Sequence, residues 1–263
     1  MPYPQARTEI LIGAERLARL RAARVLVAGL GGVGGHVAEA LGRAGVGRLT
    51  LLDHDTVSPS NLNRQLLALH STLNRSKVEV MAERLHDIDP MLELTLLNEF
   101  LQPDMADALV TTLPLTPNHS LATHKESQPL YDYVADCIDS IACKAALVTA
   151  CHRHGVPVIS ALGAGNCLDV SRVRVAKLNQ TQGCPLAREL RRQLRKSGTP
   201  LNYPVIYSDE QRSSPLPHQP AGGDTPGRPR AVNGTISYMP ALFGVMLAGV
   251  VIRQLLEGGE GIE

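Results

Sequence analysis

Four glycines stand at the spacing that a phosphate-binding turn requires. Gly29, Gly31 and Gly34 form a G-x-G-x-x-G pattern directly after a short apolar run, and Gly32 lies inside the same turn. Glycine lets backbone N–H groups approach a phosphate at the positive end of the following helix. Asp53 ends the next apolar run, where a carboxylate can accept hydrogen bonds from both ribose hydroxyls. The chain therefore predicts a nucleotide site, although this pattern alone does not separate NAD from ATP.

Polar and basic side chains beyond Asp53 favour a triphosphate. Asn61, Arg64 and Gln65 follow in the loop after the second apolar run, and Lys77 begins the next helical segment. Arginine can grip phosphate oxygens with its fork, and lysine can attract them as a point charge. A dinucleotide pyrophosphate needs no such cluster, because backbone amides satisfy it. ATP is thus favoured, and an NAD-dependent oxidoreductase is the second alternative.

Asp139 follows a further apolar run, at the position where ligands bind in parallel α/β sheets. Its carboxylate could hold Mg²⁺ against phosphates. It could equally cap the helix that follows. The residue pattern leaves both interpretations open.

These side chains can meet only on a scaffold that brings the ends of several strands together. Along the first two thirds of the chain, short apolar runs alternate with helical segments. Strands are predicted at 24–28, 48–52, 92–97, 133–138 and 157–162, and helices at 33–44, 75–88 and 140–154. Such alternation requires right-handed crossovers between parallel strands. The fold class that follows is α/β, with a doubly wound, mostly parallel, Rossmann-like sheet flanked by helices.

The pattern changes after Gly165. The remaining elements are an alternating strand at 170–178, a helix at 185–196, a strand at 203–207 and an apolar helix at 240–256. Alternation of apolar and polar residues is typical of a half-exposed antiparallel strand. We therefore expect an antiparallel C-terminal extension of the sheet.

One domain of 1–263 accommodates all these elements. Its expected parts are an N-terminal helical arm at 1–23, a nucleotide-binding core at 24–165 and the extension at 166–263, with long loops at 113–130 and 209–230.

Composition narrows the class of protein. The five cysteines include no C-x-x-C pair, which excludes a zinc site of the paired type and fits a reducing, cytoplasmic location. The first ten residues hold charges and do not resemble a signal peptide. The uncharged run from Gly234 to Ile252 is close to membrane-spanning length, but a buried core helix is the better interpretation. A membrane span is therefore not expected.

Basic residues concentrate late in the chain, although the net charge is only +1. Between Arg172 and Arg230 there are eleven Lys/Arg against four Asp/Glu. Five of them recur at helical offsets 0, 3, 4, 7 and 8: Arg188, Arg191, Arg192, Arg195 and Lys196. Such a face can follow an RNA phosphate backbone. An ordinary solvated helix face is the alternative.

Four segments resemble the ThiF/MoeB/HesA superfamily of ubiquitin-activating-type adenylyltransferases: GLGGVGG from Gly29, LLDHDTVSPSNLNRQ from Leu51, KVEVMAERLHDIDP from Lys77 and DCIDS from Asp136. The resemblance implies ATP-dependent adenylation of a carboxylate. By matching motifs it implies Asp53 on ribose, Mg²⁺ on Asp139, and Asn61, Arg64 and Lys77 on phosphates. It also implies a homodimer, in which the partner subunit contributes the arginine that corresponds to Arg7. ATP and Mg²⁺ are the expected cofactors, a monovalent cation is left open, and zinc is not expected.

Within the superfamily, the chain most resembles the tRNA threonylcarbamoyladenosine dehydratases. The segments that carry this likeness are RTEILIGAERLARL, RLHDIDP, the DCIDS-x-x-x-K segment that ends at Lys144, GCPLARELRRQLRK and VIYSDEQ. The implied reaction adenylates the carboxylate of threonylcarbamoyladenosine in tRNA and then removes water by ring closure. Activation of a ubiquitin-like sulfur-carrier protein is the alternative. It is disfavoured because the chain lacks the paired zinc cysteines of carrier activators, and the resemblance supplies no cysteine nucleophile.

Two positions depart from the pattern of the superfamily. Relatives usually have glycine before the basic residue near Lys77, whereas this chain reads N-R-S-K. Asn74 can also adopt the left-handed conformation, so the turn can be preserved. Cys184 stands where relatives commonly have aspartate, and a small residue before a helix is favoured there over a reactive thiol.

Overall fold

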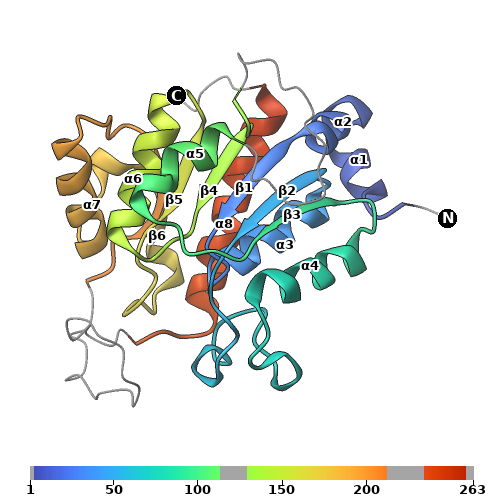
Figure 1. Ribbon diagram of the computed structural model, residues 1–263, viewed down its shortest axis with the longest axis horizontal. Coiled ribbons are helices and arrows are strands. Elements are labelled where there is room, and N and C mark those ends of the chain that lie inside the picture. Colours follow the sequence, from blue (N-terminus) through green and yellow to red (C-terminus); the bar gives the residue numbers. More distant parts are fainter. Residues whose placement is uncertain (1–2, 113–128, 212–233, 259–263) are drawn as a thin grey trace.

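A single seven-stranded sheet forms the centre of the molecule (Figure 1). The computed structural model describes residues 3–112, 129–211 and 234–258. The strands are β1 Arg24–Ala28, β2 Arg48–Leu52, β3 Glu93–Leu97, β4 Tyr133–Asp136, β5 Val158–Ala161, β6 Val173–Lys177 and β7 Pro204–Ser208. They are ordered β3-β2-β1-β4-β5-β7-β6. All neighbouring pairs are parallel except β6 and β7, so the mostly parallel α/β fold is confirmed.

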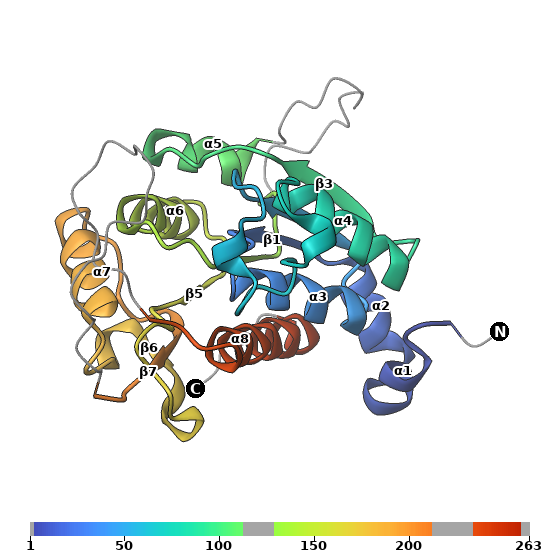
Figure 2. The same cartoon turned by 90° about the horizontal axis from the view of Figure 1, so that it is seen from below.

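Helices cover both faces of this sheet (Figure 2). They are α1 Ala6–Ile12, α2 Ala14–Ala22, α3 Gly34–Ala44, α4 Lys77–Ile88, α5 Ala106–Thr111, α6 Ile141–Arg153, α7 Pro185–Lys196 and α8 Tyr238–Glu257. One apolar core lies between the sheet and helices α3, α4 and α8, and a second lies between the sheet and helices α5, α6 and α7. The core is almost entirely aliphatic, as the scarcity of aromatic residues requires.

The C-terminal extension combines both strand directions. Strand β7 continues the parallel sheet beside β5, with Ala161 opposite Ile206. Only the edge strand β6 runs antiparallel, with Val175 opposite Ile206. Helix α5 was not predicted, since its six residues are too few to show a helical period. The loops expected at 113–130 and 209–230 lie almost wholly outside the described residues.

The chain order reverses at β1, which pairs with β2 on one side and with β4 on the other. Strands β2 and β3 continue in one direction and β4 and β5 in the other. The carboxyl ends of β1 and β4 therefore diverge into loops that cross opposite faces. Ligands of open α/β sheets bind in the crevice at this point.

Helix α8 is a core element that lies beside α3 (Figure 2). Among the described helices it alone is long and apolar enough to span a membrane, with a mean hydropathy of 1.8. Its Phe243 and Leu247 are fully buried. A Cβ on Gly244 would lie 2.6 Å from the Val33 carbonyl oxygen, so the two helices are in close contact at this glycine. The apolar character of α8 serves this packing, as the sequence predicts.

Candidate nucleotide site

The glycine loop makes its turn between β1 and α3 as predicted. Gly29 has a φ of +88°, which an L-residue rarely adopts, and a Cβ there would lie 2.9 Å from the Cys137 carbonyl oxygen. A Cβ on Gly34 would fall 1.7 Å from the Gly29 carbonyl oxygen. A Cβ on Gly32 would lie 2.9 Å from the Pro240 Cβ of α8. The loop is thus a compact backbone cradle at the start of a helix, which fits a phosphate.

Asp53 lies at the end of β2 and is oriented by backbone amides. Its Oδ2 accepts a hydrogen bond of 2.6 Å from the Leu30 N–H, and its Oδ1 accepts one of 2.8 Å from the Asp55 N–H. The side chain is 9% exposed. Each carboxylate oxygen can accept more than one hydrogen bond, so acceptor capacity is left for a ribose.

Arg64 and Gln65 line the same cavity as the glycine loop. The Arg64 Nη1 donates to the Ser60 carbonyl oxygen at 2.8 Å and to the Asn63 Oδ1 at 2.9 Å. Burial lowers the pKa of the Arg64 guanidinium, so a nearby anion would stabilise its charge. The buried Gln65 Oε1 has no hydrogen-bond partner among the described residues. This oxygen can accept a hydrogen bond from water or from a donor group on a bound molecule.

Asn61 is placed differently from its neighbours in the motif. Its Oδ1 accepts a hydrogen bond of 3.1 Å from the Ser58 N–H and thereby closes the short turn Pro59–Asn61. Asn61 is not among the described residues that line the cavity. The side chain stabilises the loop that carries Arg64, and its predicted contact with phosphate stays a prediction.

Lys77 begins α4 and points into the cavity with its ammonium 2.6 Å from the Asp55 Oδ2. The lysine side chain is 4% exposed, whereas that of Asp55 is 50% exposed. The turn before it is left-handed at Asn74, with a φ of +64°. Asparagine thus provides the turn conformation expected of it in place of glycine.

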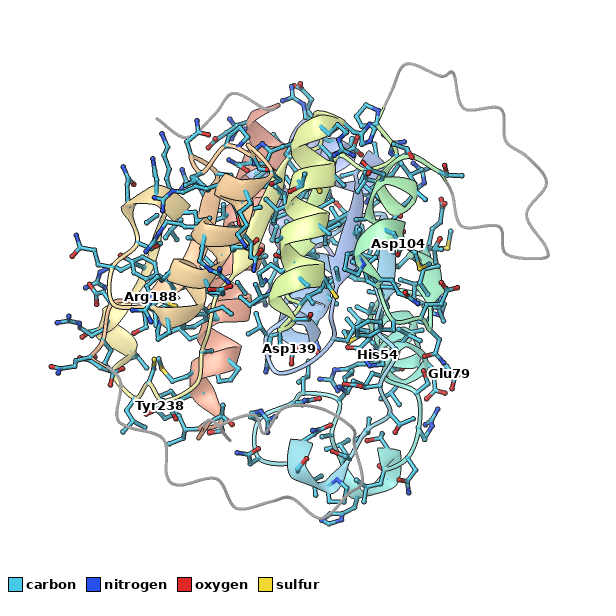
Figure 3. All side chains as sticks on the ribbon, turned by 60° about the vertical axis from the view of Figure 1, so that its left-hand side comes forward. His54, Glu79, Asp104, Asp139, Arg188 and Tyr238 are labelled. Atoms are coloured by element: carbon cyan, nitrogen blue, oxygen red, sulfur yellow. The ribbon has the colours of Figure 1, made fainter. Side chains whose placement is uncertain are left out.

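Asp139 is exposed and lines the cavity just before α6; His54 lines the same cavity, and Figure 3 labels both. A carboxylate is the ligand type that Mg²⁺ prefers, and Mg²⁺ commonly takes its other ligands from phosphates and water. Asp139 lines the same cavity as Arg64 and Lys77, which fits a metal held against a triphosphate.

A second acidic group lies close by: the ligand atoms of Asp53, His54 and Asp55 are within 4.8 Å of one another. In that group the Asp53 carboxylate accepts hydrogen bonds from two backbone amides, and the Asp55 carboxylate forms an ion pair with the Lys77 ammonium. The role of Asp139 as the Mg²⁺ ligand stays a prediction.

The cavity has a volume of about 890 Å³ and extends from the glycine loop to the N-terminal turn of α7. Several of its walls were not predicted from the sequence. His54 and Phe100 meet edge to face with ring centroids 4.8 Å apart, and both line it. Leu186 and Glu189 of α7 line its other end. Gly163, Ala164 and Gly165, in the turn after β5, line the cavity as well.

Beneath the cavity lies an ion pair between Lys144 of α6 and Asp136 of β4. The Lys144 Nζ is 2.8 Å from the Asp136 Oδ2, and both side chains are 0% exposed. The Ser160 hydroxyl also donates to this Oδ2, at 2.6 Å. Sequence reasoning noted Lys144 only as part of a motif, because nothing in the local pattern marks a helix lysine as buried.

The basic face of α7 is smaller than its sequence spacing suggests. The Arg191 Nη1 donates to the carbonyl oxygens of Leu178, at 3.2 Å, and Thr181, at 3.1 Å, so this guanidinium is used inside the fold. Arg192 pairs with Glu189 at 2.5 Å. Arg188, which Figure 3 labels on the outer side of α7, is exposed, as are Arg192, Arg195 and Lys196. These four residues form the basic α7 face.

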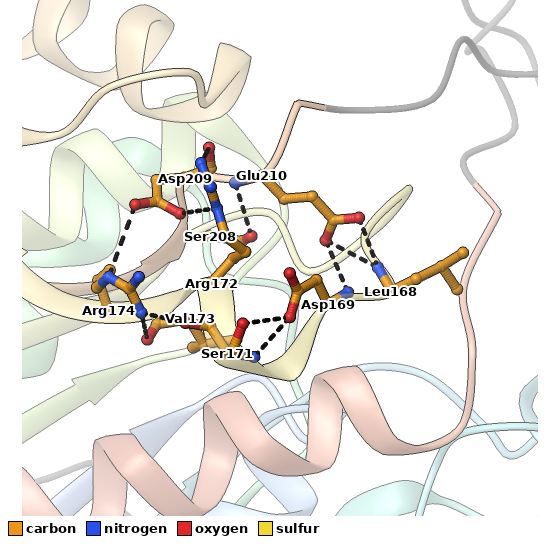
Figure 4. Close-up of polar contacts among 9 residues, drawn as sticks. All are labelled: Leu168, Asp169, Ser171, Arg172, Val173, Arg174, Ser208, Asp209 and Glu210. Atoms are coloured by element: carbon orange, nitrogen blue, oxygen red, sulfur yellow. Dashed lines mark hydrogen bonds and ion pairs between the residues drawn. The ribbon is translucent and has the colours of Figure 1, made fainter.

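Part of the late basic excess is neutralised next to β6 (Figure 4). The Arg172 Nε lies 2.7 Å from the Asp209 Oδ1, and the Arg174 Nε lies 3.6 Å from the Asp209 Oδ2. Beside them, the Glu210 carboxylate accepts hydrogen bonds from the Leu168 and Asp169 N–H groups. Arg172 and Arg174 thus share one carboxylate, so part of the basic excess is balanced next to β6.

Arg7 lies on α1, which packs at the amino ends of the strands and away from the cavity (Figure 1). Gln5, just before this helix, donates to the Asp89 Oδ2 at 2.9 Å. Arg7 is exposed, and Ile10 and Leu11 on the same helix are 86% and 84% exposed. The structure thus does not bring Arg7 to the site of its own chain.

Three comparisons relate this arrangement to known proteins. The tRNA threonylcarbamoyladenosine dehydratase of Bacillus subtilis (strain 168) is 34% identical over 264 residues, which cover 98% of this chain and 96% of that protein. The structure of the Escherichia coli enzyme of that name, TcdA, in complex with ATP matches with a TM-score of 0.80 and 30% identity over 97% of this chain and 95% of that chain. The molybdopterin-synthase adenylyltransferase of Salmonella typhimurium (strain LT2) is 40% identical over 141 residues, which cover 54% of this chain and 49% of that protein.

The ThiF family model matches residues 5–262, from the helix that carries Arg7 to beyond α8. The glycine loop, the Asp53–Lys77 segment and Asp139 all lie within that match. By this match the chain belongs to the ThiF family.

Proposed function

We propose that this protein uses ATP to adenylate the carboxylate of threonylcarbamoyladenosine in tRNA and then closes the modified residue into a ring. The observation that carries the proposal is the extent of the likeness. The match to a tRNA threonylcarbamoyladenosine dehydratase spans 98% of the chain and includes α7, whereas the match to a carrier-protein activator spans only 54%. The cytoplasm, where tRNA is modified, is the location that fits this activity.

The first step is an attack on ATP. A carboxylate oxygen of the substrate attacks the α-phosphorus, the bond to pyrophosphate breaks, and an acyl-adenylate forms. The glycine-loop amides, Arg64 and Lys77 hold the phosphates and stabilise charge on the leaving group. Asp139 would hold Mg²⁺, which when bound neutralises pyrophosphate oxygens. Positioning and charge therefore suffice, and no side-chain nucleophile is needed.

The second step removes AMP. An internal nitrogen of the activated residue attacks the acyl carbon, the acyl–phosphate bond breaks, and a proton leaves the nitrogen. The balance of both steps is loss of one water from the modified residue, with ATP converted to AMP and pyrophosphate. The cysteines take no part in this sequence.

The cavity supports a tRNA acceptor. It opens toward Leu186 and Glu189 on the first turns of α7, while the basic α7 face lies on the outer side of the same helix. A modified nucleotide entering past Leu186 would leave the flanking phosphates near Arg188, Arg192 and Arg195. Electrostatic attraction of that kind governs much of the affinity for RNA.

Mass spectrometry of nucleosides provides the test. Wild-type protein, ATP, Mg²⁺ and tRNA bearing threonylcarbamoyladenosine should give a nucleoside that is lighter by one water, with one pyrophosphate released per turnover. The same tRNA without the modification should be inert. ATP–pyrophosphate exchange that depends on a carrier protein ending in Gly-Gly, with both tRNAs inert, would contradict the proposal and favour the sulfur-carrier alternative.

We further propose that the active species is a homodimer in which Arg7 reaches the site of the partner subunit. The support is the position of α1 at the amino ends of the strands, away from the cavity of its own chain, and the exposure of its apolar residues Ile10 and Leu11. Mixing two inactive proteins, Arg7→Ala and Arg64→Ala, should restore activity, because each mixed dimer contains one site with both arginines. A mixture that exchanges subunits yet stays inactive would exclude this arrangement.

A further inference from the structure

The hydrogen-bond ladder between β4 and β5 stops where the cavity begins. Within the ladder, the Val134 N–H donates to the Pro157 carbonyl oxygen at 2.8 Å, and Asp136 stands opposite Ser160. In parallel strands the next donors follow at steps of two residues. Continued strands would therefore direct the Ile138 N–H to the Ala161 carbonyl oxygen.

Side chains replace that missing bond. The Ile138 N–H donates instead to the Asp136 Oδ1, at 3.2 Å. The Ala161 carbonyl oxygen accepts from the Lys144 Nζ, at 3.0 Å. The same Nζ lies 2.8 Å from the Asp136 Oδ2. The separation of β4 from β5 leaves the Ile138 N–H and the Ala161 carbonyl oxygen without each other as partners. The buried Asp136–Lys144 ion pair provides a hydrogen bond to each of them.

The separation creates two opposing walls of the cavity. Residues 137–141 leave β4 on one side, and residues 161–166 leave β5 on the other. Asp139 lies in the first of these segments, three residues after Asp136. Because a buried ion pair gains little stability over apolar residues of the same volume, its presence here calls for a positional explanation.

We infer that Asp136 and Lys144 are positioning residues, which hold the ends of β4 and β5 apart and thereby fix the Asp139 carboxylate at its place in the cavity. This inference rests on the proposed role of Asp139 as the Mg²⁺ ligand. Neither residue contacts the nucleotide; both act through the turn that carries Asp139. Groups that orient a metal ligand commonly change metal affinity by about 10- to 100-fold when they are replaced.

A double variant, Asp136→Asn with Lys144→Met, tests the inference without leaving one charge buried alone. Asparagine replaces the carboxylate that accepts from the Ile138 N–H with a neutral and weaker amide acceptor, and methionine keeps most of the lysine volume. The Ala161 carbonyl oxygen loses its donor, so Ile138 is free to pair with it and draw Asp139 toward β5. ATP binding, measured by calorimetry over a Mg²⁺ titration, should require at least about tenfold more Mg²⁺ for half-maximal effect. Affinity for AMP without Mg²⁺ should stay within about twofold, since it uses the glycine loop and Asp53.

The matched control is Arg24→Met with Asp132→Asn. It removes the ion pair of 3.0 Å at the amino ends of the central strands β1 and β4, whereas the cavity lies at their carboxyl ends. This variant should bind ATP with the wild-type Mg²⁺ dependence. A purely structural role for Asp136 and Lys144 predicts that both double variants lower the melting temperature and that neither shifts the Mg²⁺ dependence.

Asp139→Asn distinguishes the metal role of Asp139 from the positioning role of Asp136 and Lys144. If this variant binds ATP with normal Mg²⁺ dependence, the metal role of Asp139 is wrong, and the inference falls with it. If Asp139→Asn loses Mg²⁺ dependence while the Asp136/Lys144 variant keeps that of the wild type, the positioning role alone is wrong. An Asp136/Lys144 variant that no longer melts cooperatively also overturns the inference, because the pair would then be required for folding itself.

Discussion

The ammonium of Lys77 and the carboxylate of Asp55 lie 2.6 Å apart, with the lysine buried and the aspartate half exposed. The positive charge of Lys77, which we assign to phosphate binding, is therefore paired with the carboxylate of Asp55 in the loop after β2. Asp55 fixes the direction of the ammonium with its Oδ2, and its Oδ1 lies 3.2 Å from the His54 Nε2.

Lys77→Met should weaken triphosphate binding selectively. Loss of one phosphate contact predicts a rise in the ATP dissociation constant of about tenfold or more, whereas AMP, which lacks the outer phosphates, should bind as before. Stability should change little, since Asp55 remains solvated. Calorimetric titration with both nucleotides measures the difference. Arg75→Met is the control, because Arg75 pairs with Glu83 on the surface of α4 and does not line the cavity.

Gly34→Ala should destabilise the fold by about 3 kcal/mol, since its Cβ would overlap the Gly29 carbonyl oxygen and strain the turn. Gly31→Ala should change stability by less than about 1 kcal/mol, because the nearest atom to its Cβ would be the Gln65 Nε2 at 3.8 Å. Urea unfolding of the two variants checks the contrast. Equal stability of the two would mean that the close contact at Gly34 does not limit this turn.

Arg195→Ala and Arg191→Ala should differ in kind, although both remove an arginine from α7. Arg195 is exposed, so its loss should lower tRNA affinity and reduce the slope of log K against log salt by about 1, with stability nearly unchanged. Loss of Arg191 removes the side-chain donor to the Thr181 carbonyl oxygen and one of the donors to the Leu178 carbonyl oxygen, which still accepts from the Thr181 hydroxyl, and should cost about 1 to 2 kcal/mol of stability, with the salt slope kept. Filter binding and urea unfolding separate the two effects. A reduced salt slope for Arg191→Ala would contradict the assignment.

Cys137 should resist alkylation in the native protein, even though it lines the cavity. Desolvation, with the nearby Asp136 carboxylate, raises the pKa of its thiol to about 12. Only the thiolate reacts, and at pH 8 a pKa of 12 leaves about one thiol in ten thousand ionised. Iodoacetamide labelling followed by peptide mass spectrometry should therefore show Cys137 unmodified at pH 8 and labelled in urea. Rapid labelling of the folded protein at pH 8 would contradict a buried, inert thiol.

The repeating strands and helices of the core could be predicted because each carries its own periodic signal. The helix predicted at 185–196 forms with those bounds, and its apolar Leu190 and Leu194 are buried. Strand β4 ends two residues earlier than predicted. The run 133–138 is apolar except for Asp136. The contact of that residue with Lys144 is a tertiary feature, which no local pattern reveals.

The functional side chains were less predictable than the backbone that carries them. Helical offsets place Arg191 beside Arg188 and Arg195, but they do not reveal that carbonyl oxygens of a neighbouring loop accept from its guanidinium. The motif places Asn61 with Arg64, yet its amide side chain closes its own turn. His54 and Phe100 come from loops after different strands, so their contact depends on the strand order and on no local pattern.

The close packing of α8 on the glycine loop also bears on how the chain is made. Pro240 lies against Gly32, and Gly244 lies against the Val33 carbonyl oxygen, so elements from near the two ends of the described sequence build one turn. During translation the glycine loop leaves the ribosome long before its backing helix is synthesised. A nascent chain stalled before Pro240 therefore has the phosphate-binding motif without its support, and we expect it to capture nucleotide only once α8 has been added.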